Sequence, residues 1–229
     1  MAVAFRSVGV STPAITTETV VDKPVGLAVG DLMIAHIVAR FDITITAPDE
    51  TWTGIRTDEY SYALSSYVWW KIADQDDVDA SDFTFTHDSK ASMGAISAWT
   101  GHDAITPINA SNGKLSGGSA TINTDAITPS VANCVLLILV AVVDDVTCGS
   151  YAITTSDPGS WAEAYDVNTL LGNDMTFTMA YSDPRPETTS TGNGTATISD
   201  PKNNIGQIIA IAPAAVVAAA GRSFGFIFG

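Results

Sequence analysis

The stretch ALSSYVWWKIADQDDVDASDFTFTHD, residues 63–88, decides the fold class of this chain. In residues 82–87, large side chains alternate with threonine, which is the two-residue period of a half-buried strand. Residues 67–72 carry apolar side chains on both faces, as a central strand does. The aspartate-rich residues 73–82 are expected to form a solvated loop between the two strands. A sugar platform, a calcium site and a catalytic acid pair are the alternatives.

The two-residue period extends along most of the chain. Residues 31–40 and 134–143 are apolar on both faces, like inner strands of a sheet. Turn signals rich in proline, glycine and aspartate recur every 8–15 residues, and only residues 213–221 favour a short helix. This pattern predicts an all-β protein, an antiparallel β-sandwich with a jelly-roll-like arrangement.

The chain also repeats itself once. The run VGDLMIAHIVARFD resembles VANCVLLILVAVVDD, Trp52 recurs as Trp161, and Met93 recurs as Ile205, at offsets of 109 and 112 residues. Five matched elements occur in the same order at nearly constant offset. Because the period is too long for a solenoid and occurs only twice, it indicates duplication of a half-domain.

We therefore expect one sandwich domain over residues 1–212, built from the half-repeats 25–105 and 120–212. Two separate sandwiches are the alternative. The join at residues 103–130 is predicted to form further short strands and loops. Residues 213–229 are predicted to be a C-terminal extension with a short apolar strand.

The charge of the chain excludes one class of partner. It has 25 Asp and Glu against 10 Lys and Arg, which gives a formal net charge of −15. Such an acidic surface repels phosphates, so we expect no nucleic-acid partner. The N-terminus lacks the pattern of a signal peptide, and the apolar residues 134–143 are too few for a membrane-spanning helix. We therefore expect no membrane partner.

Two cysteines, Cys134 and Cys148, flank a turn expected at Asp144–Asp145. A hairpin centred on that turn would place Cys134 opposite a residue near position 155, not opposite Cys148. Two free thiols are therefore favoured over a disulfide.

The carboxylates show no recognisable metal-binding or catalytic pattern. The acidic loop lacks the glycine and the terminal glutamate of an EF-hand, so a calcium site is not expected. The pair Asp49–Glu50 faces no other carboxylate that the sequence identifies, whereas a glycosidase needs two facing carboxylates. We predict no catalytic residue, no metal, no cofactor and no enzymatic activity. The aspartates of the loop are Asp74, Asp76, Asp77, Asp79 and Asp82.

The three histidines have no spacing typical of a zinc site. His36 shares a face with Leu32 and Val38, so we expect a hydrogen-bonded core residue. His87 is expected at the rim, at the end of a strand, and His102 in a turn.

The five tryptophans could stack on sugars, as in carbohydrate-binding modules. However, Trp52 and Trp161 occupy equivalent repeat positions, which favours a shared packing role. Trp70 is expected in or beside the core. These three residues form the core signature of the repeat.

The final residues SFGFIFG carry Phe224, Phe226 and Phe228 on one face of an extended strand, with Ile227 between them. A monomer would hardly expose such a run. It either completes its own sandwich or pairs with a neighbouring subunit, and both readings stay open.

The first half-repeat resembles a β-sandwich module of tailed-bacteriophage virion proteins. In that module a Gly-Asp-Leu opener, an Ile-Thr-x-Pro turn ending in Trp, an aromatic pair before Lys, a Thr-Phe-Thr strand and a Gly-Ala-Ile strand follow one another. They correspond here to Gly30–Leu32, Ile45–Trp52, Trp69–Lys71, Thr84–Thr86 and Gly94–Ile96. The likeness covers residues 25–105 well and 120–212 more loosely.

The resemblance implies a non-enzymatic virion structural protein, either a capsid decoration, a head fibre or a tail component. Its partners would be other copies of itself, as a homo-oligomer, and other virion proteins. It would lie on the exterior of the virion after synthesis in the host cytoplasm. The alternative is a carbohydrate-binding adhesin or receptor-binding module that contacts a cell-surface glycan.

Overall fold

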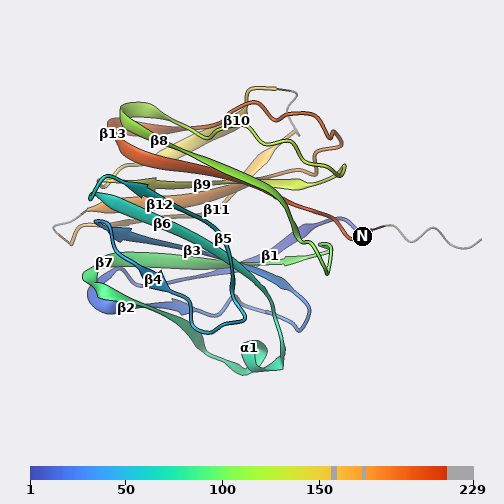
Figure 1. Cartoon of the computed structure of the whole chain (residues 1–229), viewed down its shortest axis with the longest axis horizontal. Helices are drawn as coiled ribbons and strands as arrows, with labels where there is room; N and C mark the ends of the chain where they lie inside the picture. Colours follow the sequence, from blue (N-terminus) through green and yellow to red (C-terminus); the bar gives the residue numbers. More distant parts are fainter. Residues whose placement is uncertain (156–158, 172–173, 216–229) are drawn as a thin grey trace, which may run out of the picture.

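The computed structural model describes residues 1–155, 159–171 and 174–215. Within these residues the chain forms two antiparallel sheets and one helix of five residues. Figure 1 shows the two sheets stacked, with the N-terminal half of the chain below and the C-terminal half above. The predicted all-β sandwich is confirmed.

The first sheet contains seven strands, in the order β1-β7-β3-β6-β5, and β2 and β4 also pair with β7. The helix α1 (Gln75–Asp79) lies in the connection from β6 to β7. The strands are β1 (Ala4–Val10), β2 (Ala14–Asp22), β3 (Leu32–Arg40), β4 (Ile45–Thr46), β5 (Thr53–Tyr60), β6 (Leu64–Ile72) and β7 (Asp82–Thr100).

The second sheet contains six strands, in the order β10-β13-β9-β12-β11, and β8 also pairs with β13. The strands are β8 (Ile108–Asn123), β9 (Val135–Val142), β10 (Cys148–Ile153), β11 (Trp161–Thr169), β12 (Met175–Ser182) and β13 (Gly194–Ile211).

The two sheets repeat one strand order, in agreement with the duplication predicted from the sequence. The central order β7-β3-β6-β5 of the first sheet corresponds to β13-β9-β12-β11 of the second. The registers match as well. Trp52 lies one residue before Thr53, which pairs with Trp70, and Trp161 lies one residue before Ala162, which pairs with Tyr181.

Two predicted strand boundaries are wrong. Residues 82–87 and 93–99 belong to the single long strand β7, and their counterparts in the second half belong to β13. The join at 103–130 contains the 16-residue strand β8 instead of several short strands. Its Ser-Asn-Gly run reads as a turn, but pairing with β13 holds it extended. Its Ser-Gly-Gly run lies at register shifts of that pairing, where Gly118 has a φ of 58°.

Other local predictions also differ from the structure. A short helix forms in the acidic loop, where a solvated loop was expected. No hairpin forms between β9 and β10, because β10 pairs with β13. Residues 213–215 are not helical, and the rest of the helix expected at 213–221 lies outside the described residues.

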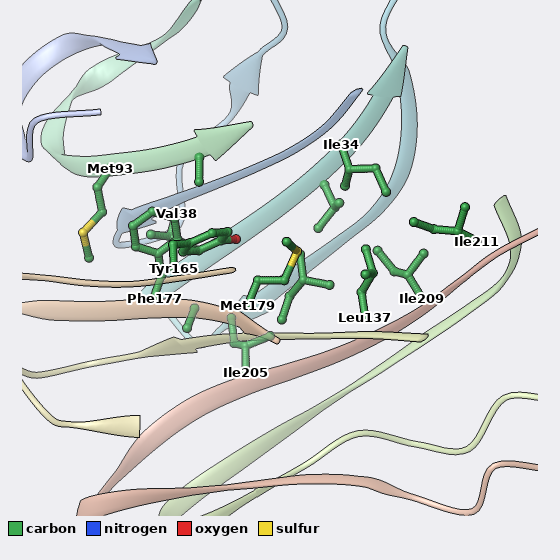
Figure 2. Packing of buried hydrophobic residues seen from close by; sticks show 14 of the residues in the cluster. Ile34, Val38, Met93, Leu137, Tyr165, Phe177, Met179, Ile205, Ile209 and Ile211 are labelled. Atoms are coloured by element: carbon green, nitrogen blue, oxygen red, sulfur yellow. The ribbon is translucent and has the colours of Figure 1, made fainter. Parts of the chain in front are cut away.

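The main core fills the space between the two sheets. Ile34 and Val38 of β3 face Leu137 of β9 and Phe177 of β12 across the two layers, as Figure 2 shows. All of these side chains are buried. Burying a side chain of this size contributes roughly 1.5–3 kcal/mol, so this interface holds the two halves together as one unit.

Each sheet is also covered on its outer face by its own strands. Phe85 and Ile96, both in β7, lie in the same cluster as Ile37 of β3 and Val21 of β2. The long strand therefore bends over the sheet to which it belongs, and β2 and β4 follow it. In the second half, β8 and the first part of β13 cover β9 in the same way. Ile122 of β8 and Ile198 of β13 pack there against the side chains of β9.

Glycine at two equivalent positions allows this close approach. A Cβ at Gly94 would lie 3.0 Å from Cγ2 of Val21 in β2, and a Cβ at Gly206 would lie 2.4 Å from the backbone oxygen of Asn123 in β8. The two glycines are 112 residues apart, the offset expected from the repeat. Each one lets an outer strand pack directly on the inner sheet.

We predict that Gly206→Ala destabilises the protein by about 2 kcal/mol, because the clashing atom belongs to the backbone and cannot rotate away. Gly149→Ala is the control, since a Cβ there meets no atom within 4 Å. Urea unfolding measures both variants. Equal stability of the two variants would contradict the close-approach argument.

Candidate functional site

The predicted partner-contact residues Phe224, Phe226, Ile227 and Phe228 lie outside the described residues, which end at Ala215. The first residues of the extension, 213–215, are described and are anchored to the sandwich. The backbone N–H of Ala214 donates to the carbonyl of Gly101, 2.8 Å away. Residues 213–215 therefore leave the sandwich at the end where the N-terminus also lies (Figure 1).

Two hollows of about 250 Å³ each border this exit. One is lined by Met1, Ala2, Asn133 and residues 213–214. The other is lined by Asp103, Thr106, Asn109 and residues 131–133 and 212–215. We call this part of the surface the terminal end.

The tryptophans pack inside the molecule. Trp52 is buried, and its ring meets the rings of Phe83 and Phe85 edge-on, with centroids 5.8 Å apart. Trp161 and Trp70 are half-buried against hydrophobic clusters. The remaining two, Trp69 and Trp99, are buried. None of the five is an exposed platform for a sugar.

The acidic loop is organised around Lys71. The Nζ atom of Lys71 lies 2.7 Å from Oδ1 of Asp77, and 3.6 and 3.7 Å from the carboxylates of Asp74 and Asp49. Lys71 and Asp77 are both buried. The sequence identified no carboxylate near Asp49, whereas in the structure Asp49, Asp74 and Asp77 all lie within 4 Å of the Lys71 ammonium group.

The helix α1 presents Asp77 to Lys71. Asp74 is its N-cap, and its side chain accepts a hydrogen bond from the N–H of Asp77, while the side chain of Asp77 accepts one from the N–H of Asp74. This capping box shifts the pKa of Asp74 below its usual value, chiefly through the hydrogen bond from the Asp77 backbone. The D-x-x-D spacing at 74–77 was the sequence signal for this helix.

We predict that Asp77→Asn destabilises the protein by about 3 kcal/mol, because it leaves the buried Lys71 without its closest charge partner. Asp76→Asn, at an exposed position of the same helix, should change the stability by less than about 0.5 kcal/mol. Millimolar calcium should not raise the melting temperature, because the ammonium group already occupies the centre of the carboxylates. A calcium-dependent rise of several degrees would contradict this assignment.

A buried polar network crosses the core between the two halves. Nδ1 of His36 lies 2.8 Å from the hydroxyl of Tyr165, and Nε2 lies 3.0 Å from Oγ of Ser66. Ser66 donates to Gln207, whose Nε2 donates to Asp58 at 2.7 Å. His36, Ser66 and Asp58 belong to the first half, and Tyr165 and Gln207 belong to the second.

The expectation of a hydrogen-bonded core histidine is confirmed for His36. Its burial lowers the pKa to about 3, so the imidazole is neutral near pH 7. Burial also raises the pKa of the Tyr165 hydroxyl. Because Ser66 and Gln207 are buried too, this set fixes the register of the two halves and does not face solvent.

His36 should make the stability depend on pH. Its pKa is about 3 in the folded state and 6.5 in the unfolded state, so below pH 6.5 the unfolded state binds more protons. Between pH 7 and 4.5, the wild type should lose roughly 2–3 kcal/mol more of its unfolding free energy than His36→Gln does. Urea titrations at the two pH values measure the difference, and identical losses would contradict the neutral buried histidine.

The other histidines lie apart from this network. His87 is inside β7, not at a strand end, and its Nε2 lies 2.9 Å from Oγ1 of Thr19. His102 is buried and pairs with Pro213 at the terminal end. Cys134 and Cys148 are free thiols, and burial raises their pKa values to about 11 and about 12. No cluster in the described part of the chain has three or more residues suited to a metal ion.

The end opposite the termini carries exposed apolar side chains on two equivalent hairpins. Tyr62, at the tip of the β5–β6 hairpin, is 79% exposed. Leu170 and Leu171, which follow β11, are 74% and 42% exposed. Phe41, after β3, is 36% exposed. We call these four residues the distal surface. In Figure 1 the turn between β5 and β6 lies at the end of the sandwich far from the N-terminus.

Two aromatic residues of the distal surface have unusual backbone conformations. Ala63 N donates to the carbonyl of Tyr60, and Ser61 and Tyr62 have φ values of 28° and 57°. This is the pattern of a type I′ turn, whose second central position normally holds glycine. Phe41 has a φ of 71°. A bulky residue in this region costs about 1–2 kcal/mol, so both aromatics lie in backbone conformations that disfavour them.

Comparison with known proteins identifies no relative. No family model matches the chain, and neither a curated protein nor a solved structure matches it. Among the described residues, no helix has both the length and the apolar character needed to cross a membrane.

Proposed function

We propose that this protein is a non-enzymatic structural component of a virion, such as a capsid decoration, a head fibre or a tail-associated protein. It acts through contacts with copies of itself and with other virion proteins, on the exterior of the particle. The proposal rests on the resemblance of residues 25–105 to virion sandwich modules, on the acidic composition, and on the apolar C-terminal run.

The observation that carries the proposal is the position of the C-terminal extension. It starts at Pro213, at one end of a sandwich whose two halves are locked by the core and by the His36 network. Between Ala215 and Phe224 the chain can span up to roughly 30 Å when extended. The three phenylalanines can therefore reach a neighbouring molecule as an added strand or an apolar plug, while the sandwich stays rigid.

A second candidate function is a carbohydrate-binding adhesin, and the exposed Tyr62 on the distal surface favours it. The hollow near this surface is polar. It has a volume of about 450 Å³ and includes Asp42, Thr44, Thr86 and Asp88 among its lining residues. Hydroxyl and carboxylate groups of this kind suit a sugar.

We expect the full-length variant Phe224→Ser, Phe226→Ser, Phe228→Ser to fold with an unchanged melting temperature but to lose association with other copies or with purified particles. Burial of three phenylalanines is worth several kcal/mol, which the serines remove. Light scattering after size-exclusion chromatography and co-sedimentation with particles measure the two effects.

The matched control replaces exposed apolar residues elsewhere: Val25→Ser, Val29→Ser, Ile105→Ser, which should associate like the natural chain. A phenylalanine variant that melts several degrees lower would instead show that the extension completes its own sandwich. Absence of the chain from purified particles would overturn the virion assignment.

A further inference from the structure

Beside the distal surface, the two halves of the chain contact each other. Arg40, the last residue of β3, donates through Nη1 to the carbonyl of Asp174, 3.3 Å away, just before β12. The next residue, Phe41, donates through its backbone to the carbonyl of Ala63 beside Tyr62. The hairpin of the first half and the connection after β11 of the second are therefore joined through Arg40 and Phe41.

The two halves of the chain are related by an internal two-fold axis that passes through this end. β5 of the first half packs against β8 of the second, and β1 of the first packs against β11 of the second. β1 pairs with the C-terminal part of β7, and the first part of β8 pairs with the C-terminal part of β13. Since β5 likewise corresponds to β11, these two contacts are equivalent. β3 and β9 both run from the terminal end to the distal end. A rotation of 180° about an axis parallel to the strands therefore relates the first half to the second. The distal surface lies at one end of this axis, with the β5–β6 turn on one side and the turn after β11 on the other.

The charges beside the distal surface are of both signs. The cationic groups of Arg40 and Lys90 lie 5.6 and 5.1 Å from the ring centre of Phe41. The adjoining hollow is lined by Asp42 and Asp88, the first next to Phe41 in sequence and the second two residues before Lys90. In a chain with a net charge of −15, copies repel one another over most of their surface. Beside the distal surface, by contrast, cations and carboxylates lie close together.

A contact between identical surfaces has to be self-complementary. The distal surface meets this requirement, because an apolar centre is bordered by adjacent positive and negative groups. Two aromatic residues also have positive φ values there although their side chains are exposed, and such strain concentrates at functional positions. A sugar would use Tyr62 and the polar hollow but would gain little from Leu170 and Leu171, which are also exposed.

We propose that two copies of this protein meet end to end through Phe41, Tyr62, Leu170 and Leu171, as a symmetric dimer. The contact goes beyond the proposed function, because its residues lie at the end opposite the C-terminal extension. With few side chains involved, the interface is small and the association weak. The two ends together would give each copy one contact through its extension and another through its distal surface.

Sedimentation equilibrium from roughly 10 µM to 1 mM tests the proposal, since this range covers the affinities of small interfaces. The background is the full-length variant Phe224→Ser, Phe226→Ser, Phe228→Ser, so that association through the extension does not interfere. In this background the protein should form a dimer, and amide exchange at residues 60–64 should slow as the concentration rises.

Two variants and a control complete the test. Tyr62→Gly should weaken the dimer at least tenfold without lowering the melting temperature, because glycine suits the type I′ turn. Leu170→Ser combined with Leu171→Ser should also weaken it at least tenfold. Ile105→Ser, at an exposed position of the terminal end, should leave it unchanged.

A protein that stays monomeric at all concentrations, or a dimer that both distal variants leave intact, would overturn the proposal. A third outcome would assign the surface to a carbohydrate instead. In that case only Tyr62→Gly loses the dimer, and the leucine variant still binds a neutral hexasaccharide.

Discussion

The inner strands of this protein must be covered on both faces, and the rest of the architecture follows from that constraint. β3 and β9 are buried along nearly their whole length. One face of each packs on the other half of the chain, and the second is covered by the long strand of its own half, which bends over the sheet. Gly94 and Gly206 make this bend possible, because any side chain there would collide with the neighbouring layer.

The core between the halves is not purely apolar, and its polar groups give it specificity. A hydrophobic interface between two similar sheets could slide by two residues and still bury apolar side chains. The chain of hydrogen bonds from Tyr165 through His36, Ser66 and Gln207 to Asp58 exists in one register only. A slip would leave several buried polar groups without partners, which costs about 1–3 kcal/mol for each group.

The packed sandwich gives its two ends different characters. The terminal end holds both described chain ends and two small hollows, and the C-terminal extension starts there. The distal end holds exposed aromatic and aliphatic side chains on equivalent hairpins. Because the core and the polar network make the body rigid, a contact at one end is held at a fixed distance from a contact at the other. Such rigidity is what the structural role proposed above requires.

The sequence by itself determined the all-β class, the duplication and the burial of His36, because alternation of side chains and a repeated order of elements are local or one-dimensional signals. It did not determine that residues 82–100 form one bent strand, since the bend depends on the outer layer that packs on Gly94. Nor did it bring Lys71 to Asp49 or Arg40 to the carbonyl of Asp174. These contacts join residues far apart in the chain, and only the packing of the two halves decides where such residues meet.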